Sequence, residues 1–355
     1  MSEPVSGAAS KGRRSLWINT AIGLTVSAAF VVLAVRGADG DALERAASTM
    51  KVWPILLYFG FLTVGHVMRI ARWSLTVRRL APLRWSTLMA IGAVGMMAVF
   101  ALPARLGEVV RPVLIARDER VGVGEVMATV VVERLADGLC VSAMMLVTVL
   151  ALDPAVVDPK YVYSGYAAVA VFGGAAVAML ALGAFFPRIR LPLEQALARV
   201  HPGLARKVVA TAGGFFGGLR LLAEPRLALT WLVSTVAIWV WSGLGIWVLF
   251  AAFPGPVAEL GPLAAFATLC VLVVGISIPS APGTVGVFHW AVAFGVGMFG
   301  IAQEEGLVLG TVLHLAVTVC NIGYGLVGWI AGGVRLTDVW RRPSGGGART
   351  DEGHR

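Results

Sequence analysis

The sequence predicts an all-α, polytopic membrane protein with about six full spanning helices and two helical hairpins in an inverted-topology repeat. Hydrophobic residues make up 58% of its 355 residues and charged residues only 14%. The mean hydropathy of +0.82 is well above that of soluble domains. Apolar runs long enough to cross a bilayer recur along the chain. Two further apolar runs are interrupted by proline and glycine, a pattern typical of transporter sites.

The charge of the chain is explained by membrane topology. The net charge is +9, but the basic residues lie in the segments between apolar runs, so no nucleic-acid partner is expected. Cys140, Cys270 and Cys320 lie within apolar segments and lack metal-ligand spacing. We therefore expect neither a disulfide framework nor a zinc site.

The chain divides into a cytoplasmic tail (1–15), one transmembrane domain (16–335) and a disordered cytoplasmic tail (336–355). The run 16–35 has the length of an uncleaved first span, and a secretory signal is the alternative. The other predicted spans are 53–69, 126–150, 161–186, 229–252 and 307–331. Four shorter apolar segments form two pairs in the sequence. The first pair is 86–101 and 106–121, and the second is 263–278 and 284–300.

The positive-inside rule decides how these short pieces are arranged. The segment 187–228 holds seven basic residues and two acids. It lies in the cytoplasm only if 86–121 is a hairpin that enters and leaves on that side. The same reasoning makes 263–300 a hairpin from the outer face and places both termini in the cytoplasm. Apolar residues of 187–228 recur at three- and four-residue spacing, which predicts a basic amphipathic helix on the cytoplasmic face.

The two hairpins give the chain an internal symmetry. Residues 53–150 form repeat A and residues 229–331 form repeat B, with opposite orientations. Each hairpin arm of roughly 16 residues is about 24 Å long, slightly short for a span, which suggests re-entrant hairpins. Irregular backbone at this depth is tolerated where it lines a polar cavity, so we expect the two tips to meet there.

Arg105, Glu108 and Arg111 lie in the first hairpin, and Gly107 opens its second arm. A guanidinium group binds phosphate through two parallel hydrogen bonds, and a helix N-terminus favours anions. Arg105 and Arg111 are therefore candidate phosphate-binding residues. An ordinary cytoplasmic loop with surface charges is the alternative.

Glu133, Arg134 and Asp137 lie in the span 126–150. Ionisable groups in a membrane helix are costly and usually pair inside the protein. We expect Glu133 or Asp137 to pair with Arg105 or Arg111 and to hold the hairpin. A purely structural role of these acids is an equal alternative, as is a location at the cytoplasmic interface.

His66, Arg69 and Arg72 recur every three residues, so they lie close to one helix face. They are candidates for a cytoplasmic entrance, with interfacial snorkelling as the alternative, which is favoured for Arg72.

The second hairpin and the last span supply further candidate substrate-binding residues. They are Ser280, Gly283, Thr284 and His289 in the hairpin, and His314 and Asn321 on one face of the span. For the last two, an interhelical hydrogen bond is the alternative.

Three motifs carry a resemblance to a known family. They are PARLGEVVR at 103–111, VERLADG at 132–138 and IPSAPGTVGVFH at 278–289. The chain resembles, from about residue 15 to 335, the lysylphosphatidylglycerol synthase transmembrane-region family, also called the flippase-like domain family. The resemblance implies a multi-pass protein of the cell (inner) membrane. Its best-known member joins such a region to a soluble aminoacyl-transferase domain and moves aminoacylated phosphatidylglycerol across the bilayer. No such domain follows here, so we expect a stand-alone transport module.

We therefore expect a protein that translocates a phospholipid or polyprenyl-linked glycolipid headgroup across the membrane. An integral membrane glycosyltransferase or lipid-modifying enzyme is the alternative, as is a scaffold for a lipid or glycan biosynthetic enzyme. The sequence contains no recognisable catalytic or ATP-binding motif, so neither enzymatic activity nor a cofactor or metal is expected. The expected partner is a membrane lipid, and both a biosynthetic enzyme partner and a homo-oligomer are compatible with the sequence.

Overall fold

The computed structural model shows a helical protein. It describes residue 44 and residues 48–102, 107–118, 121–151, 159–199, 201–219, 224–277 and 282–332. Within these ranges the regular elements are helices, and no strand occurs. The predicted first span and both predicted tails lie outside the described residues.

Four of the described helices are long and apolar enough to cross a membrane. They are α3 (Val52–Leu80), α7 (Pro159–Ala198, through its part Gly173–Ala198), α9 (Pro225–Phe250) and α13 (Gln303–Gly332). The helix α6 (Val123–Leu150) has 28 residues and carries three ionisable side chains near its middle. The prediction of a helical membrane protein is therefore confirmed.

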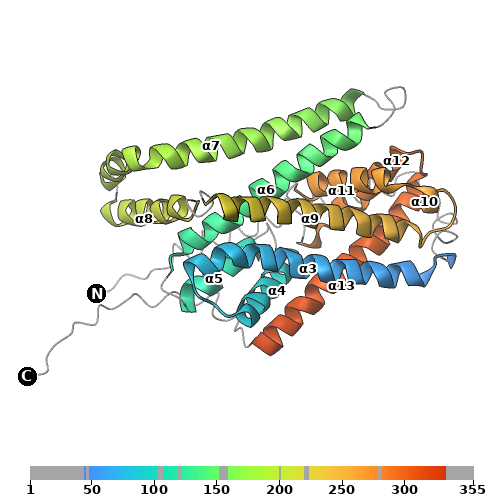
Figure 1. Cartoon of the computed structure of the whole chain (residues 1–355), viewed down its shortest axis with the longest axis horizontal. Helices are drawn as coiled ribbons and strands as arrows, with labels where there is room; N and C mark the ends of the chain where they lie inside the picture. The colour runs from blue at the N-terminus through green and yellow to red at the C-terminus, as the bar shows by residue number, and fades with distance from the viewer. Residues whose placement is uncertain are drawn as a thin grey trace, which may run out of the picture.

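The short helices form two pairs at the predicted hairpin positions. The first pair is α4 (Trp85–Ala101) and α5 (Gly107–Asp118), and the second is α11 (Pro262–Ser277) and α12 (Val287–Gly297) with the 3-10 turn η3 (Pro282–Thr284) between them. The one-turn helix α10 (Pro256–Glu259) precedes the second pair. Figure 1 shows the first pair toward one end of the long helices and the second pair toward the other. The longer arms, α4 and α11, reach only about 26 and 24 Å.

Each pair packs against the long helices of both halves of the chain. The helix α4 packs on α5 and α13, and α11 packs on α12 and α6. In turn α5 packs on α6, α12 packs on α13, and α3 packs on α9. The helices α4 and α13 approach closely at Gly325 and Gly328, which have no side chains. A Cβ at Gly325 would overlap Met97, and a Cβ at Gly328 would lie 2.9 Å from the Ala90 carbonyl oxygen. Small residues permit such close helix contacts in membranes.

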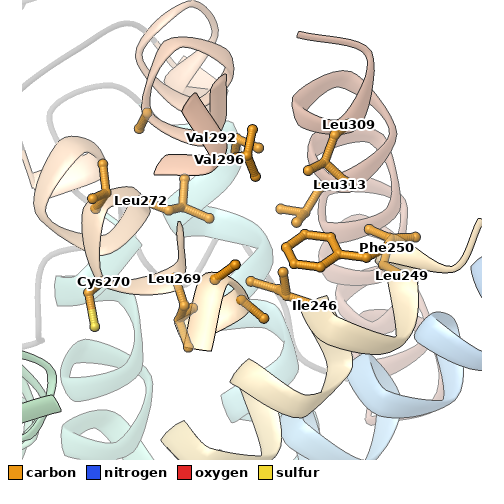
Figure 2. Close-up of a cluster of buried hydrophobic side chains, with 14 of the residues drawn as sticks. Ile246, Leu249, Phe250, Leu269, Cys270, Leu272, Val292, Val296, Leu309 and Leu313 are labelled. Atoms are coloured by element: carbon orange, nitrogen blue, oxygen red, sulfur yellow. The ribbon is translucent and has the colours of Figure 1, made fainter. Parts of the chain in front are cut away.

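The larger hydrophobic core joins α9, α11, α12 and α13. Figure 2 shows Phe250 from α9 between Leu313 of α13 and the side chains of α11 and α12. A second, smaller core joins α3, α4, α5 and α6 around Trp73, Val94 and Ile115. Each short-helix pair is thus anchored by its own apolar cluster, and polar side chains gather between the two clusters.

Two helix bounds differ from the sequence prediction. The helix α3 continues past the predicted end at residue 69 and ends at Leu80, because no earlier residue breaks it. Its C-cap, Ala81, is extended and immediately precedes Pro82. The helix α7 continues to Ala198 through Pro187 and Pro192. Residues 187–198 of the predicted surface connector therefore extend α7. The remainder contains α8 (Pro202–Leu219), which packs on α6 and α7.

Candidate functional site

A cavity of about 280 Å³ lies between the two pairs of short helices. It is lined by side chains of the helices α3, α4, α5, α6, α9, α11, α12 and α13 and of the turn η3. The predicted site residues that line it are His66, Arg69, Glu108, Arg111, Arg134, Asp137, Gly283, Thr284 and Asn321. Residues of both predicted repeats therefore meet at one cavity. Arg105 and Ser280 lie outside the described residues.

Arg72 is the centre of the charged cluster beside this cavity. Its side chain is buried, with 1% of the residue exposed. Nη1 and Nη2 donate to the two carboxylate oxygens of Asp137 at 2.7 and 3.2 Å. Nη1 also donates to Thr235 Oγ1 at 2.8 Å, and the guanidinium lies 4.7 Å from the Trp231 ring centroid. The interpretation of Arg72 as a snorkelling residue is therefore wrong. The arginine lies inside the continuing helix α3 because Asp137 compensates its charge there.

Glu133 joins three guanidinium groups and is fully buried. Its carboxylate accepts hydrogen bonds from Arg111 at 3.1 Å, from Arg134 at 3.2 Å and from Arg72 at 3.4 Å. The predicted pairing of Glu133 with Arg111 is confirmed, and it ties α5 to α6. Arg111 also lies 4.9 Å from the Trp73 ring centroid and fills the space beside Gly95, where any side chain would overlap it.

Asp137 connects three long helices, α6, α3 and α9. Besides Arg72 of α3, Trp239 of α9 donates its Nε1–H to Asp137 at 3.0 Å. Asp137 lies about 21 Å along α6 from Val123, half-way along the helix. Both acids are buried inside the protein. Buried charges require compensation by partners, which this cluster supplies.

Arg69 faces the cavity one helical turn before Arg72. Its Nη2 donates to Ser242 Oγ at 3.1 Å, and its guanidinium lies 4.9 Å from the Trp239 ring centroid. Ser242 in turn donates to the Ile238 carbonyl oxygen of its own helix at 2.7 Å, which fixes the hydroxyl. Arg69 makes no salt bridge with any described carboxylate.

His66 completes this face of α3. Its ring packs against Tyr324 of α13 at a centroid distance of 4.6 Å, and the Tyr324 hydroxyl is hydrogen-bonded to Thr63. The Nε2 atom of His66 is buried without a hydrogen-bond partner among the described residues. His66 and Arg69 thus both line the cavity from one face of α3.

The second hairpin presents backbone rather than charge. Gly283 has φ +73°, a conformation that strongly favours glycine, and Thr284 follows at φ 56°. His314 Nε2 donates to the Gly283 carbonyl oxygen at 2.6 Å, which joins α13 to the hairpin. His289 Nδ1 accepts the Gly286 N–H at 3.4 Å. The two histidines support the hairpin and do not line the cavity, whereas Gly283 and Thr284 do.

Asn321, a predicted site residue, lines the cavity and donates to the Val317 carbonyl oxygen of its own helix at 2.8 Å.

Several polar residues of α9 near the cavity were missed by the sequence prediction. Thr235, Trp239 and Ser242 of α9 were missed, and each contacts an arginine or an acid of the cluster. Their spacing of four and three residues places them on one face of an apolar helix, and that polar stripe was the available signal.

The described residues contain no group of three or more His, Cys, Asp or Glu side chains placed to hold a metal ion. The functional groups that the cavity offers are guanidinium and carboxylate groups, hydroxyls, an imidazole and apolar side chains. This combination can bind an anionic headgroup next to hydrocarbon.

Comparison with known proteins identifies the family. No curated protein matches the chain. The model of the lysylphosphatidylglycerol synthase TM region matches residues 20–325, which include both short-helix pairs and all residues of the cavity. The expected resemblance is thus confirmed over most of the chain, and the helices are those of a multi-pass membrane protein of this kind. The chain belongs to the lysylphosphatidylglycerol synthase transmembrane-region family.

Proposed function

We propose that the protein translocates the headgroup of a phospholipid or polyprenyl-linked glycolipid across the cell membrane. The observation that carries the proposal is the cavity that lies between the two short-helix pairs and beside ion pairs at the middle of α6. Its charged wall suits a headgroup, and its apolar wall, which includes Leu272 and Val317, suits the start of acyl or polyprenyl chains. Family membership is consistent with a role in lipid metabolism or translocation.

In this proposal the two halves of the chain form an inverted-topology repeat. The packing pattern supports it, because exchanging the halves preserves these helix contacts. The contacts α4–α5, α5–α6 and α4–α13 correspond to α11–α12, α12–α13 and α11–α6, and α3–α9 corresponds to itself. Hairpins that approach one cavity from opposite ends offer a route for alternating access.

The hydrogen bonds that Glu133 and Asp137 accept favour translocation over catalysis. Glu133 and Asp137 each accept hydrogen bonds from two or more cationic or indole donors. A carboxylate used in this way is stabilised as an ion and is poorly suited to act as a general base. We propose that these two acids hold the cavity together and that the protein is not an enzyme.

We further propose that the end of α3 near Arg78 and Arg79 is cytoplasmic, following the positive-inside rule. In a protein from which the three native cysteines have been removed, cysteines at Arg206 and Ala258, both exposed, should then be labelled from opposite sides of the membrane. The measurement is labelling by a membrane-impermeant maleimide in intact cells and in inside-out vesicles. Labelling of both positions from one side would contradict the topology.

Translocation itself is tested by filling the cavity. Val317 lines the cavity, whereas Val319, two residues further on the same helix, is 58% exposed. In proteoliposomes, Val317→Trp should reduce headgroup translocation at least about tenfold because the indole fills the cavity, and Val319→Trp should leave it unchanged. The assay follows reporter-labelled lipids becoming accessible to an impermeant quencher. Absence of translocation by the folded wild-type protein for both anionic phospholipids and polyprenyl-phosphate sugars would contradict the proposal.

A further inference from the structure

The described charged side chains of the site include one more cation than anions. The described residues of the site hold four guanidinium groups, from Arg69, Arg72, Arg111 and Arg134, and three carboxylates, from Glu108, Glu133 and Asp137. One positive charge therefore remains within this set. Arg72, Arg111 and Arg134 each form a salt bridge with Glu133 or Asp137, and Arg69 forms none with a described carboxylate.

Arg69 is also the guanidinium group whose orientation leaves it available to a ligand. The paired arginines direct their terminal nitrogens at carboxylates. Arg69 donates one hydrogen bond to a neutral hydroxyl, Ser242, and stacks on Trp239. The Ser242 hydroxyl donates its own hydrogen to Ile238, so its oxygen holds the arginine without neutralising it. A charge in this setting is complemented by an anion that enters the cavity.

A second, independent feature of the same wall points to a ligand. His66 is 8% exposed and lines the cavity, and its buried Nε2 atom has no partner among the described residues. A buried polar atom without a partner is uncommon and costly in folded proteins. Packing against Tyr324 fixes the ring, so the atom is preorganised rather than loose. His66 and Arg69 are one helical turn apart on α3, so one ligand group can reach both.

We propose that Arg69 and His66 form the anion-binding subsite of the cavity and that this subsite takes one singly charged phosphodiester. One phosphodiester oxygen accepts from the Arg69 guanidinium and another from the Nε2–H of neutral His66. A diphosphate would bring at least one negative charge more than the described cluster can neutralise. Phosphatidylglycerol and a polyprenyl monophosphate sugar share this phosphodiester chemistry. The inference rests on the proposed lipid translocation for its choice of ligand.

The test is equilibrium binding of reporter-labelled phosphatidylglycerol to the purified full-length protein in nanodiscs, with unlabelled lipids as competitors. Arg69→Gln should raise the Kd at least about tenfold, because hydrogen bonds to charged groups contribute at this level. His66→Phe keeps the ring contact with Tyr324, removes Nε2 and should weaken binding roughly threefold or more. Arg79→Gln is the matched control. It removes an exposed arginine of α3 that pairs with Glu224 at 3.3 Å, and should leave the Kd unchanged.

Each outcome decides a separate point. Wild-type affinity in folded Arg69→Gln would overturn the subsite, even if translocation were intact. Stronger competition by a polyprenyl diphosphate sugar than by either phosphodiester lipid would overturn the single-charge assignment. No binding of any lipid by the folded wild-type protein would overturn both. Binding that depends on Arg69 without any translocation would sustain the subsite and refute the proposed transport. The stronger competitor of the two phosphodiester lipids identifies the source of the headgroup.

Discussion

Replacing Arg72 by alanine should destabilise the protein more than any substitution on its surface. The change removes the closest cationic partner of Asp137 and one of the three guanidinium partners of Glu133, and both acids are buried. Of the described cations, Arg134 at 3.6 Å then remains beside Asp137. Removing one member of a buried ion pair costs about 3–5 kcal/mol, because the remaining charge stays desolvated and uncompensated. The measurement is the free energy or midpoint of unfolding of the purified protein in one detergent.

The double variant Arg72→Ala, Asp137→Leu provides the control for this prediction. Removing both charges eliminates the uncompensated ion, so the double variant should be more stable than Arg72→Ala or Asp137→Leu alone. Glu133 keeps Arg111 and Arg134 in that variant. Strictly additive losses in the double variant would show that Arg72 and Asp137 are not energetically coupled, contrary to their 2.7 Å contact.

The second large effect is expected at Gly107, where α5 begins against α4. A Cβ atom here would overlap the backbone of Ala98 and Val99. Backbone atoms cannot rotate away as a flexible side chain does, so Gly107→Ala should force the two short helices apart at a cost of about 1–3 kcal/mol or more. Because Arg111 lies one turn further along α5, its pairing with Glu133 should weaken as well.

Gly60→Ala is the matched control for Gly107→Ala. Gly60 lies within α3, and a Cβ there meets no atom within 4 Å. Its replacement should be neutral, or stabilising by roughly 0.5–1 kcal/mol through better helix propensity. Both variants are compared by unfolding midpoint and by lipid translocation. Equal stability of the two variants would show that α4 and α5 are not held as closely as described.

The position of the hairpins was predictable because their sequences violate the pattern of a span. Proline, glycine and charge occur together within apolar runs. The signs of the neighbouring charges predict that the two hairpins enter from opposite faces. The Glu133–Arg111 pair was predictable for a related reason. A buried carboxylate requires a cation, and Arg111 was one of two candidates in the adjacent hairpin.

Arg72 was not predictable from its local sequence. Five arginines between residues 69 and 84 follow an apolar run. The same pattern is typical of the cytoplasmic end of a membrane helix. Which of them are buried depends on Asp137 and Thr235, which are more than 60 residues away in the chain. The proposed role of Arg69 was partly visible in its three-residue spacing from His66. That it forms no salt bridge with a described carboxylate could be seen only from the structure.

The three ionisable residues at the middle of α6 also bear on how the chain enters the membrane. On insertion scales a charged side chain at the centre of a helix costs about 2.5–3.5 kcal/mol, so Glu133, Arg134 and Asp137 make α6 a poor substrate for partition as a single segment. Ribosomal synthesis delivers α3 before α6 and α9 afterwards. The acids of α6 therefore emerge when Arg72 is already present to neutralise them, and the indoles of α9 cover the pair last. The helices are therefore synthesised in an order that lets α6 enter the membrane paired with α3.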